Sequence, residues 1–287
     1  MRLLGIHHVA AIAANREFVE TFYGATLGLE QGRVAATSDD RPLEFLAPDG
    51  SALHVYVRPE ERPGRTGHGG IYRVIWRVGS PAALDHWSKR LPALGTPVIA
   101  FRSTRRRRPA LHFCDPDGVQ HELIADPDAA GLGDGADRHA ILGIAGVRAY
   151  ARNPVPTGDL LAGRLGFTGL SERNLALGDG PSRVEYRIDV PLRPRRARPG
   201  TGTIHHVAWA CAPGDEAAWR QRVIGMGARV TRARRGHTGS SIYFREPSGV
   251  LFEVKPVAST DAGRRLAEAA PAPPTTELRL PLPLTAA

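Results

Sequence analysis

The chain has 287 residues, of which 42% are hydrophobic, and carries a formal net charge of +9. This composition is typical of a globular protein and allows one or two domains around a sizeable core. No apolar run reaches the roughly 18 residues that span a bilayer, and the N-terminus lacks a signal-peptide pattern, so we expect a cytoplasmic protein. Cys114 and Cys211 are too few for a disulfide framework.

Arginine supplies most of the positive charge, gathered in three clusters at 105–108, 193–200 and 232–235. The clusters stand beside proline and glycine between predicted strands, which indicates loops. No helix-turn-helix, zinc-finger or aromatic-interleaved basic strand accompanies them, so nucleic acid is not the expected partner. A solvated arginine-rich surface is the simplest interpretation, and steering of an anionic substrate or partner is the alternative.

The chain begins with a predicted strand over 5–13, where an apolar run contains two adjacent histidines (GIHHVAAIA). Asn15 is placed to cap a helix over 16–30, whose apolar residues recur at helical spacing. Two strands follow over 43–48 and 51–57, separated by an Asp-Gly turn. The order is therefore one strand, one helix and further strands.

The same order of elements recurs three more times, beginning at Ile71, Leu142 and Thr203. Helices are predicted in the three later copies at 81–95, 157–169 and 215–228. Strands are predicted at 71–78, 96–101, 109–118, 119–126, 143–151, 174–180, 182–190, 202–210 and 242–254. The copies also match in sequence, since GIHHVAAIA in the first parallels GTIHHVAWA in the fourth.

These repeats predict an α+β protein of four βαβββ modules that form curved mixed sheets with the helices outside. We expect three parts, an N-terminal domain, a C-terminal domain and an Ala- and Pro-rich tail. The domains span 1–135, with modules at about 4–58 and 69–126, and 136–257, with modules at about 141–192 and 203–257, and the tail spans 258–287. The tail is expected to lie extended over the body or to be disordered.

The repeats also single out a set of candidate metal ligands. His206 and Glu253 interrupt the apolar first and last strands of the fourth copy, and His8 and His54 stand at nearly the same separation in the first copy. A single histidine on an apolar strand is more often a core residue than a ligand, but here the pattern repeats. If the first and fourth copies face each other, His8, His206 and Glu253 converge. Two imidazoles and one carboxylate suit non-heme Fe(II), with Mn(II) an alternative.

The two middle copies lack this set. The second copy has Arg73 and Glu122 at the corresponding positions, which we interpret as a buried ion pair. The third copy has Gly146 at the position of His206 and no clear equivalent of Glu253. The chemistry is therefore expected in the first and fourth copies alone.

The four-module layout, the two HHV strands and the GVLFEV strand resemble the vicinal oxygen chelate superfamily, which includes glyoxalase I, fosfomycin-resistance proteins and extradiol dioxygenases. More narrowly, the chain resembles four-module ring-cleaving dioxygenases of the hydroquinone type. The resemblance implies His8, His206 and Glu253 as metal ligands. It also implies that His7 and His205 support the ligands or act as acid/base groups, and that Tyr243 hydrogen-bonds a substrate oxygen.

The chain departs from that pattern at three places. Ala10 stands where the related dioxygenases carry a hydroxyl residue. The loop at 234–241 has no aromatic residue before Tyr243 and offers Arg235 and His237 as its polar groups. His54 replaces a residue that is usually not a ligand, so it either provides a fourth ligand, as in a glyoxalase-like site, or lines the pocket.

The resemblance predicts an enzyme, a non-heme Fe(II) extradiol-type dioxygenase that cleaves a hydroquinone- or catechol-like aromatic. Mn(II) or Zn(II) are alternative metals. The expected partners are a small aromatic substrate and dioxygen, with no membrane, and the chain is expected to form a homo-oligomer. A glyoxalase-like metal-dependent lyase or isomerase is the first alternative, and a small-molecule-binding resistance protein of the same fold is the second.

Overall fold

The structure is a computed structural model, and it describes residues 1–32, 41–101, 109–133, 137–193, 195–228, 230 and 241–257. The predictions for the arginine clusters at 105–108 and 232–235, for Arg235 and His237, and for the tail at 258–287 lie outside these residues. No helix among the described residues is both long and apolar enough to cross a membrane.

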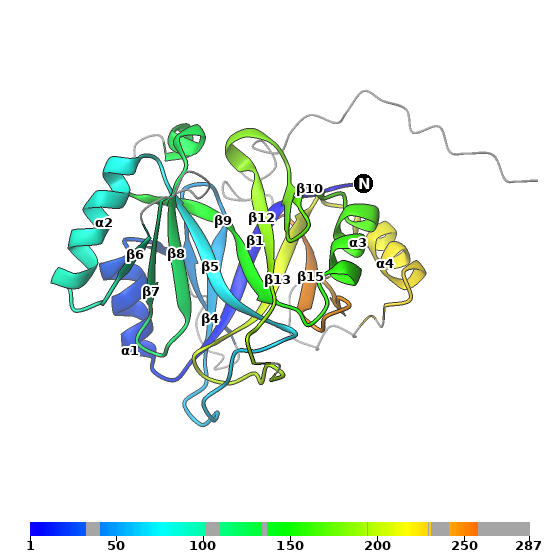
Figure 1. The fold of residues 1–287 in the computed structure, drawn as a ribbon, viewed down its shortest axis with the longest axis horizontal. Helices are drawn as coiled ribbons and strands as arrows, with labels where there is room; N and C mark the ends of the chain where they lie inside the picture. Colours follow the sequence, from blue (N-terminus) through cyan, green and yellow to red (C-terminus); the bar gives the residue numbers. More distant parts are fainter. Residues whose placement is uncertain are drawn as a thin grey trace, which may run out of the picture.

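Two mixed sheets form the centre of the molecule (Figure 1). The first has seven strands, in the order β14 (Ile242–Arg245), β15 (Leu251–Pro256), β13 (Thr203–Cys211), β1 (Leu3–Ala13), β4 (Ala52–Val57), β3 (Leu43–Leu46) and β2 (Glu30–Gln31). It therefore joins the fourth module to the first.

The second sheet joins the third module to the second. Its eight strands run in the order β10 (Thr168–Ser171), β11 (Asn174–Leu177), β12 (Val184–Asp189), β9 (Ile141–Tyr150), β5 (Gly70–Val78), β8 (Gln120–Ala125), β7 (Ala110–Cys114) and β6 (Ile99–Phe101). In both sheets the first and last strands of a module pair in parallel, and two modules meet through antiparallel first strands.

The helices lie outside the sheets, those of the first two modules at one side of Figure 1 and those of the last two modules at the other. The helical segments are α1 (Arg16–Val19), which continues as the π-helix η1 (Glu20–Thr26), α2 (Pro81–Ala93), α3 (Val155–Arg164), α4 (Glu216–Gly225) and the short 3-10 helices η2 (Pro127–Gly133) and η3 (Gly180–Ser182). The α+β class and the modular architecture are confirmed. The division into two domains at residue 135 stays a prediction. The helices group according to this division, whereas each sheet contains strands from both sides of it.

One helix end agrees with the prediction from the sequence, and another does not. The Asn15 side chain accepts a hydrogen bond from the Phe18 N–H, as an N-cap should. The third helix was predicted to reach residue 169, but α3 ends at Arg164. Gly166 follows with φ +81°, a left-handed conformation that ends helices, and the chain turns into β10.

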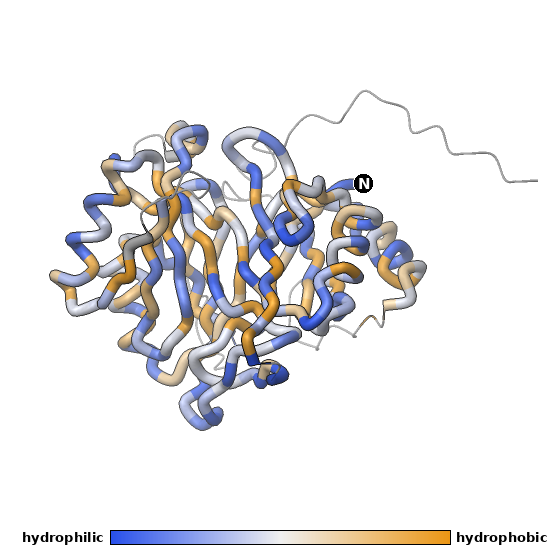
Figure 2. The backbone as a smooth tube through the Cα atoms, in the orientation of Figure 1, coloured by the Kyte–Doolittle hydropathy of each residue, from blue (hydrophilic) through white to orange (hydrophobic). Residues whose placement is uncertain are grey.

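Buried apolar side chains from both sheets and from the helices form the core. Along the strands, apolar residues are interspersed with polar ones (Figure 2). A buried polar network interrupts the core. The Tyr23 hydroxyl donates to Asp115 at 2.7 Å and lies 3.1 Å from Nε2 of His121, and the Trp76 indole donates to Nδ1 of His121 at 3.1 Å. The network links the helix of the first module to the strands of the second.

Candidate metal centre

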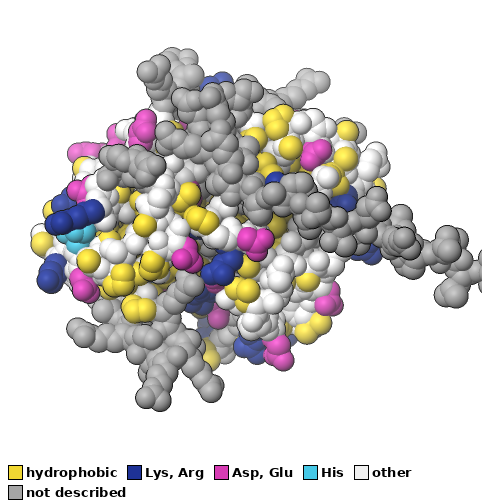
Figure 3. Space-filling model, turned by 90° about the horizontal axis from the view of Figure 1, so that it is seen from above, with side chains coloured by type: hydrophobic (Ala, Val, Ile, Leu, Met, Phe, Trp, Pro, Cys, Tyr) yellow, Lys and Arg dark blue, Asp and Glu magenta, His cyan; other side chains and the backbone are white. Residues whose placement is uncertain are grey.

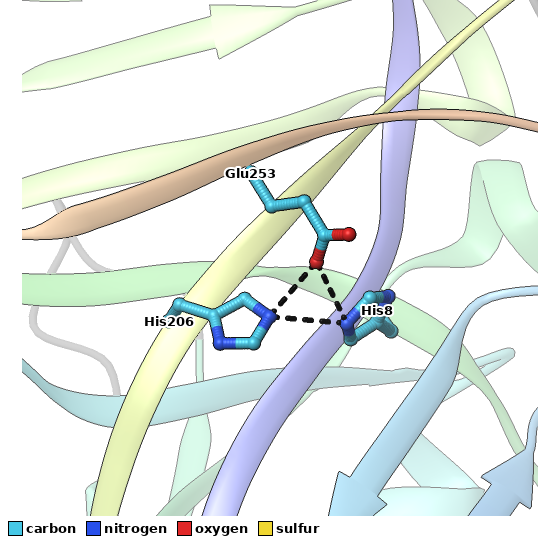
Figure 4. A group of neighbouring side chains, drawn as sticks. All are labelled: His8, His206 and Glu253. Carbon is cyan, nitrogen blue, oxygen red and sulfur yellow. Dashed lines mark hydrogen bonds and ion pairs between the residues drawn. The ribbon is translucent and has the colours of Figure 1, made fainter. Parts of the chain in front are cut away.

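Three side chains from distant parts of the chain meet at the junction of the first and fourth modules. His8 lies on β1, His206 on β13 and Glu253 on β15 (Figure 4). The pairing explains the meeting, because His206 is opposite Ala10, two residues from His8, and Glu253 is opposite Ala208, two residues from His206. Residues two apart share one face of a strand, so all three side chains project from the same face.

The donor atoms of these residues are close together and buried. Nε2 of His206 lies 2.9 Å from Oε2 of Glu253, Nε2 of His8 lies 3.3 Å from the same oxygen, and the two Nε2 atoms are 3.2 Å apart. All three residues are at most 2% exposed. Within the described part of the chain, no other group of three or more His, Cys, Asp or Glu residues brings its ligand atoms so close.

The electrostatics of the site favour a charged Glu253 carboxylate beside a neutral His8 imidazole. Burial alone would raise the pKa of the Glu253 carboxyl, but hydrogen bonds from His206 and His8 hold it well below its usual range. Burial, together with the nearby His54, lowers the pKa of His8 well below its ordinary value. An ionised carboxylate beside a neutral imidazole is the protonation state that metal binding requires.

The histidine that precedes each of these imidazoles supports it from behind. Nδ1 of His7 lies 3.1 Å from Nδ1 of His8, and Nδ1 of His205 lies 2.8 Å from Nδ1 of His206. Each central imidazole thus presents Nε2 to the cluster and has Nδ1 held by a neighbour, an arrangement that fixes the tautomer and ring orientation of a metal ligand. Burial, aided by Lys255, lowers the pKa of His7 to about 3.

Tyr243 lies beside the cluster on β14. It pairs in register with Glu253, and its ring meets the His206 ring edge to face at 5.6 Å. Burial raises the pKa of the Tyr243 hydroxyl well above its usual value, and the charge of Glu253 and a hydrogen bond to it add to the effect. The hydroxyl is therefore a neutral hydrogen-bond donor at the edge of the site.

His54 occupies the position in the first module that Glu253 occupies in the fourth. Its ring stacks on the His8 ring with centroids 3.9 Å apart, and its Nε2 lies 3.0 Å from Oε1 of Glu44 rather than joining the donor cluster. Burial lowers the pKa of His54, and the hydrogen bond from His54 lowers that of Glu44. The sequence did not single out Glu44. This residue lies on the strand before the turn of the first module, as Tyr243 lies on the strand before the Pro-Ser-Gly turn of the fourth.

In the second sheet, an ion network fills the equivalent positions. Nη1 of Arg73 lies 3.4 Å from Glu122, which confirms the predicted ion pair. Two further arginines, Arg148 at 2.6 Å and Arg187 at 3.3 Å, reach the same carboxylate. In the third module Arg187 is opposite Arg148, just as Glu253 is opposite Ala208 in the fourth. Arg187 is therefore the third-module equivalent of Glu253, which the sequence did not reveal.

Glu122 is 2% exposed, and burial alone would raise its pKa. Hydrogen bonds from His112 and Arg148 and the charges of the arginines hold that pKa well below its usual range. This network has one carboxylate and several guanidiniums at its centre and therefore offers no donor set for a cation.

The structure describes only some of the residues at which the chain departs from the dioxygenase pattern. Ala10 is buried opposite His206, so a methyl group stands where a hydroxyl was expected in relatives. Arg235 and His237 lie outside the described residues. On the face seen in Figure 3, the described lysine and arginine side chains are scattered among acidic and apolar ones rather than gathered into one basic patch.

Comparison with known proteins agrees with this architecture. No known family profile matches the chain. Two curated Bacillus subtilis (strain 168) proteins, described as candidate ring-cleaving dioxygenases MhqO and MhqA, are each 28% identical to it over 88% of its length, covering 84% and 87% of their own lengths.

Solved structures give the same fold. A candidate dioxygenase from Bacillus subtilis superposes with a TM-score of 0.75 at 25% identity, covering 89% of this chain and 86% of that one. Glyoxalase I from Zea mays superposes with a TM-score of 0.66 at 12% identity, covering 92% and 94%, and this likeness concerns the fold alone. The module order, the fold and these relatives support the predicted resemblance of the chain to the vicinal oxygen chelate superfamily.

Proposed function

We propose that this chain is a metal-dependent ring-cleaving dioxygenase that uses non-heme Fe(II) and acts on a hydroquinone- or catechol-like aromatic. The observation that carries the proposal is the convergence of His8, His206 and Glu253, whose ligand atoms all lie within 4.8 Å of one another. Two imidazoles and one carboxylate are the donor set of Fe(II) oxygenases, because three protein ligands leave coordination positions for substrate and oxygen. The similarity to candidate ring-cleaving dioxygenases supports the same reaction class.

The residues present fit a single divalent ion. Donor atoms that lie about 2.1 Å from one ion at adjacent corners are about 3 Å from each other, and here the separations are 2.9 to 3.3 Å. The carboxylate is ionised, and both imidazoles present Nε2. The same donors also accept Mn(II) or Zn(II), so the donor set by itself does not select iron. Iron is favoured by the proposed reaction class.

The surrounding side chains would orient the site and the substrate. A bound ion would act as a Lewis acid toward a phenol and would supply the redox centre that reaction with dioxygen requires. His7 and His205 hold the Nδ1 atoms of the two ligand imidazoles. Tyr243, neutral at working pH, would donate a hydrogen bond to a substrate oxygen. His205 is exposed and is the better placed of the two histidines to accept the phenol proton.

The test is anaerobic reconstitution of the full chain with Fe(II), followed by oxygen uptake on a panel of hydroquinones and catechols. We expect uptake of one dioxygen per ring cleaved, with at least one member of the panel. Absence of uptake by a fully loaded protein with every member would contradict ring cleavage.

A second candidate function is a glyoxalase-like lyase or isomerase, in which the metal polarises a carbonyl without oxygen chemistry. The observation that favours it is the position of His54, which is equivalent to Glu253 and stacks on His8. A fourth protein ligand would leave fewer positions for substrate and oxygen together. Metal content of the wild-type chain and of His54→Ala separates the two functions.

A further inference from the structure

A second feature of the molecule is a cavity of about 270 Å³ whose polar lining is basic. It lies where the segment after β4 meets the segment before β13, at the start of β13 and β5. Four arginines, Arg65, Arg196, Arg198 and Arg245, line it together with His205. None of the described residues that line it is acidic.

Three of the four guanidiniums of this cavity are held by backbone carbonyls. Arg65 donates to the Arg196 carbonyl at 3.2 Å, Arg198 to the Pro63 carbonyl at 2.8 Å and Arg245 to the Gly249 carbonyl at 2.7 Å. Within the described ranges, no carboxylate lies within ion-pair distance of these four arginines. Among the described residues, no carboxylate therefore compensates their positive charge.

The walls of the cavity are built by close contact between separate segments. Isolated bridges connect Pro63 with Thr201 and Arg65 with Arg198. Gly69 has φ +77°, and a Cβ at this position would lie 2.6 Å from the Ser248 carbonyl oxygen, so only glycine allows the backbones to approach. The arrangement is fixed by the main chain rather than by a chance gathering of surface side chains.

One wall of the cavity, Arg245, lies on the face of the sheet that carries the metal centre. In the β14–β15 pair, Tyr243 is opposite Glu253 and Arg245 is opposite Leu251. Residues two apart point to one face, about 7 Å from each other along the strand. Arg245 therefore stands one step beyond Tyr243 on the face that carries Glu253. His205, which lines the cavity, lies 2.8 Å from the ligand His206.

We propose that this arginine cavity binds an anionic substituent of the substrate, so that the preferred aromatic carries a carboxylate beyond the ring that reaches the metal. The inference rests on the proposed function for the identity of the ring, but the cavity itself is independent of it. Guanidinium–carboxylate hydrogen bonds are charge-assisted and bidentate, and they are stronger where the cation has no competing carboxylate. The cavity lies beside the metal centre, so one small molecule spans both.

The test compares two hydroquinones that differ by one charged group. Metal-loaded full-length protein is titrated anaerobically with 2,5-dihydroxyphenylacetate and with 2,5-dihydroxytoluene, and the two Kd values are measured by calorimetry. We expect the carboxylate to bind at least about tenfold more tightly at low ionic strength, a preference that declines as salt screens the charges. Arg65→Gln combined with Arg245→Gln should bring the ratio close to one.

The control removes the same charge elsewhere. Arg152 and Arg220 are exposed and lie outside the cavity, so Arg152→Gln combined with Arg220→Gln should keep the preference. Thermal unfolding checks that each double variant is folded. If a double variant is not folded, the single variant Arg198→Gln takes its place. Equal affinity for the two compounds in the wild type, or a preference that survives loss of the cavity arginines, would overturn the proposal.

Oxygen uptake on the same two compounds keeps this proposal separate from the proposed function. Uptake with both compounds but without arginine-dependent preference would leave ring cleavage standing and remove the anion site. Arginine-dependent binding without uptake from any hydroquinone or catechol would keep the anion site and remove ring cleavage.

Discussion

His54 stacks face to face on His8, with the two ring centroids 3.9 Å apart and the planes inclined by 17°. A ring in this position shields one side of a ligand imidazole, and its Nε2 points to Glu44, 3.0 Å away. His54 and Glu253 therefore occupy equivalent positions in their modules but have different roles. Glu253 joins the donor cluster, and His54 supports a ligand of that cluster.

His54→Ala should therefore leave the metal content of the protein close to one ion per chain. Loss of the stacked ring would lower metal affinity by about tenfold, because an outer partner of a ligand is removed rather than a ligand. Metal analysis after anaerobic dialysis against a graded chelator measures this. A protein that loses its metal as completely as His206→Ala does would show that His54 is a ligand and would favour the lyase.

Removing the support behind a ligand should weaken the site without destroying it. We expect His205→Phe to lower metal affinity by about 10- to 100-fold, because Nδ1 of His206 loses the partner that fixes its orientation. Competition with a fluorescent chelator measures the affinity. His86→Phe on α2, distant in the fold, is the matched control and should behave as the wild type. Equal affinity in both variants would argue against a supporting role.

The ion network of the second sheet should contribute to stability and not to metal binding. Glu122→Gln leaves three guanidiniums around a neutral group, and loss of a buried partner of this kind costs about 3–5 kcal/mol. Chemical denaturation of metal-free protein measures the free energy of unfolding. Glu60→Gln, at an exposed position, is the control. A variant with unchanged stability, or with lost metal binding, would contradict the structural role.

Asp115 should make the stability depend on pH between about 4 and 6. Burial raises its pKa from 3.8 to about 6 despite the hydrogen bond from Tyr23. Because the folded state holds this proton more tightly than the unfolded state, the contribution is fully present below pH 3.8. It is lost as pH rises through 6, a change of about 3 kcal/mol.

Asp115→Asn should remove this component. Denaturation curves of metal-free wild-type and variant proteins at several pH values between 4 and 7 isolate it, because all other titrating groups are shared. If the difference in unfolding free energy between the two proteins is constant over that range, Asp115 has an ordinary pKa.

Much of the site could be predicted because each ligand stands out against an apolar strand. His8, His206 and Glu253 are the residues that a buried strand tolerates least, and the repeat indicated which strands share a sheet. Glu44 and Arg187 were missed because their significance depends on cross-strand register, which a single sequence does not specify. The arginine cavity was also hidden, since segments far apart in the chain form it. The cytoplasmic location and the homo-oligomer remain predictions.

The most direct test of the account is metal analysis of the chain purified without oxygen, alongside Glu253→Ala. The account predicts about one iron per wild-type chain and almost none in the variant, because the variant lacks the only charged donor of the set. A wild-type chain that holds no first-row metal even after anaerobic loading, or a variant that binds iron as tightly as the wild type, would contradict it.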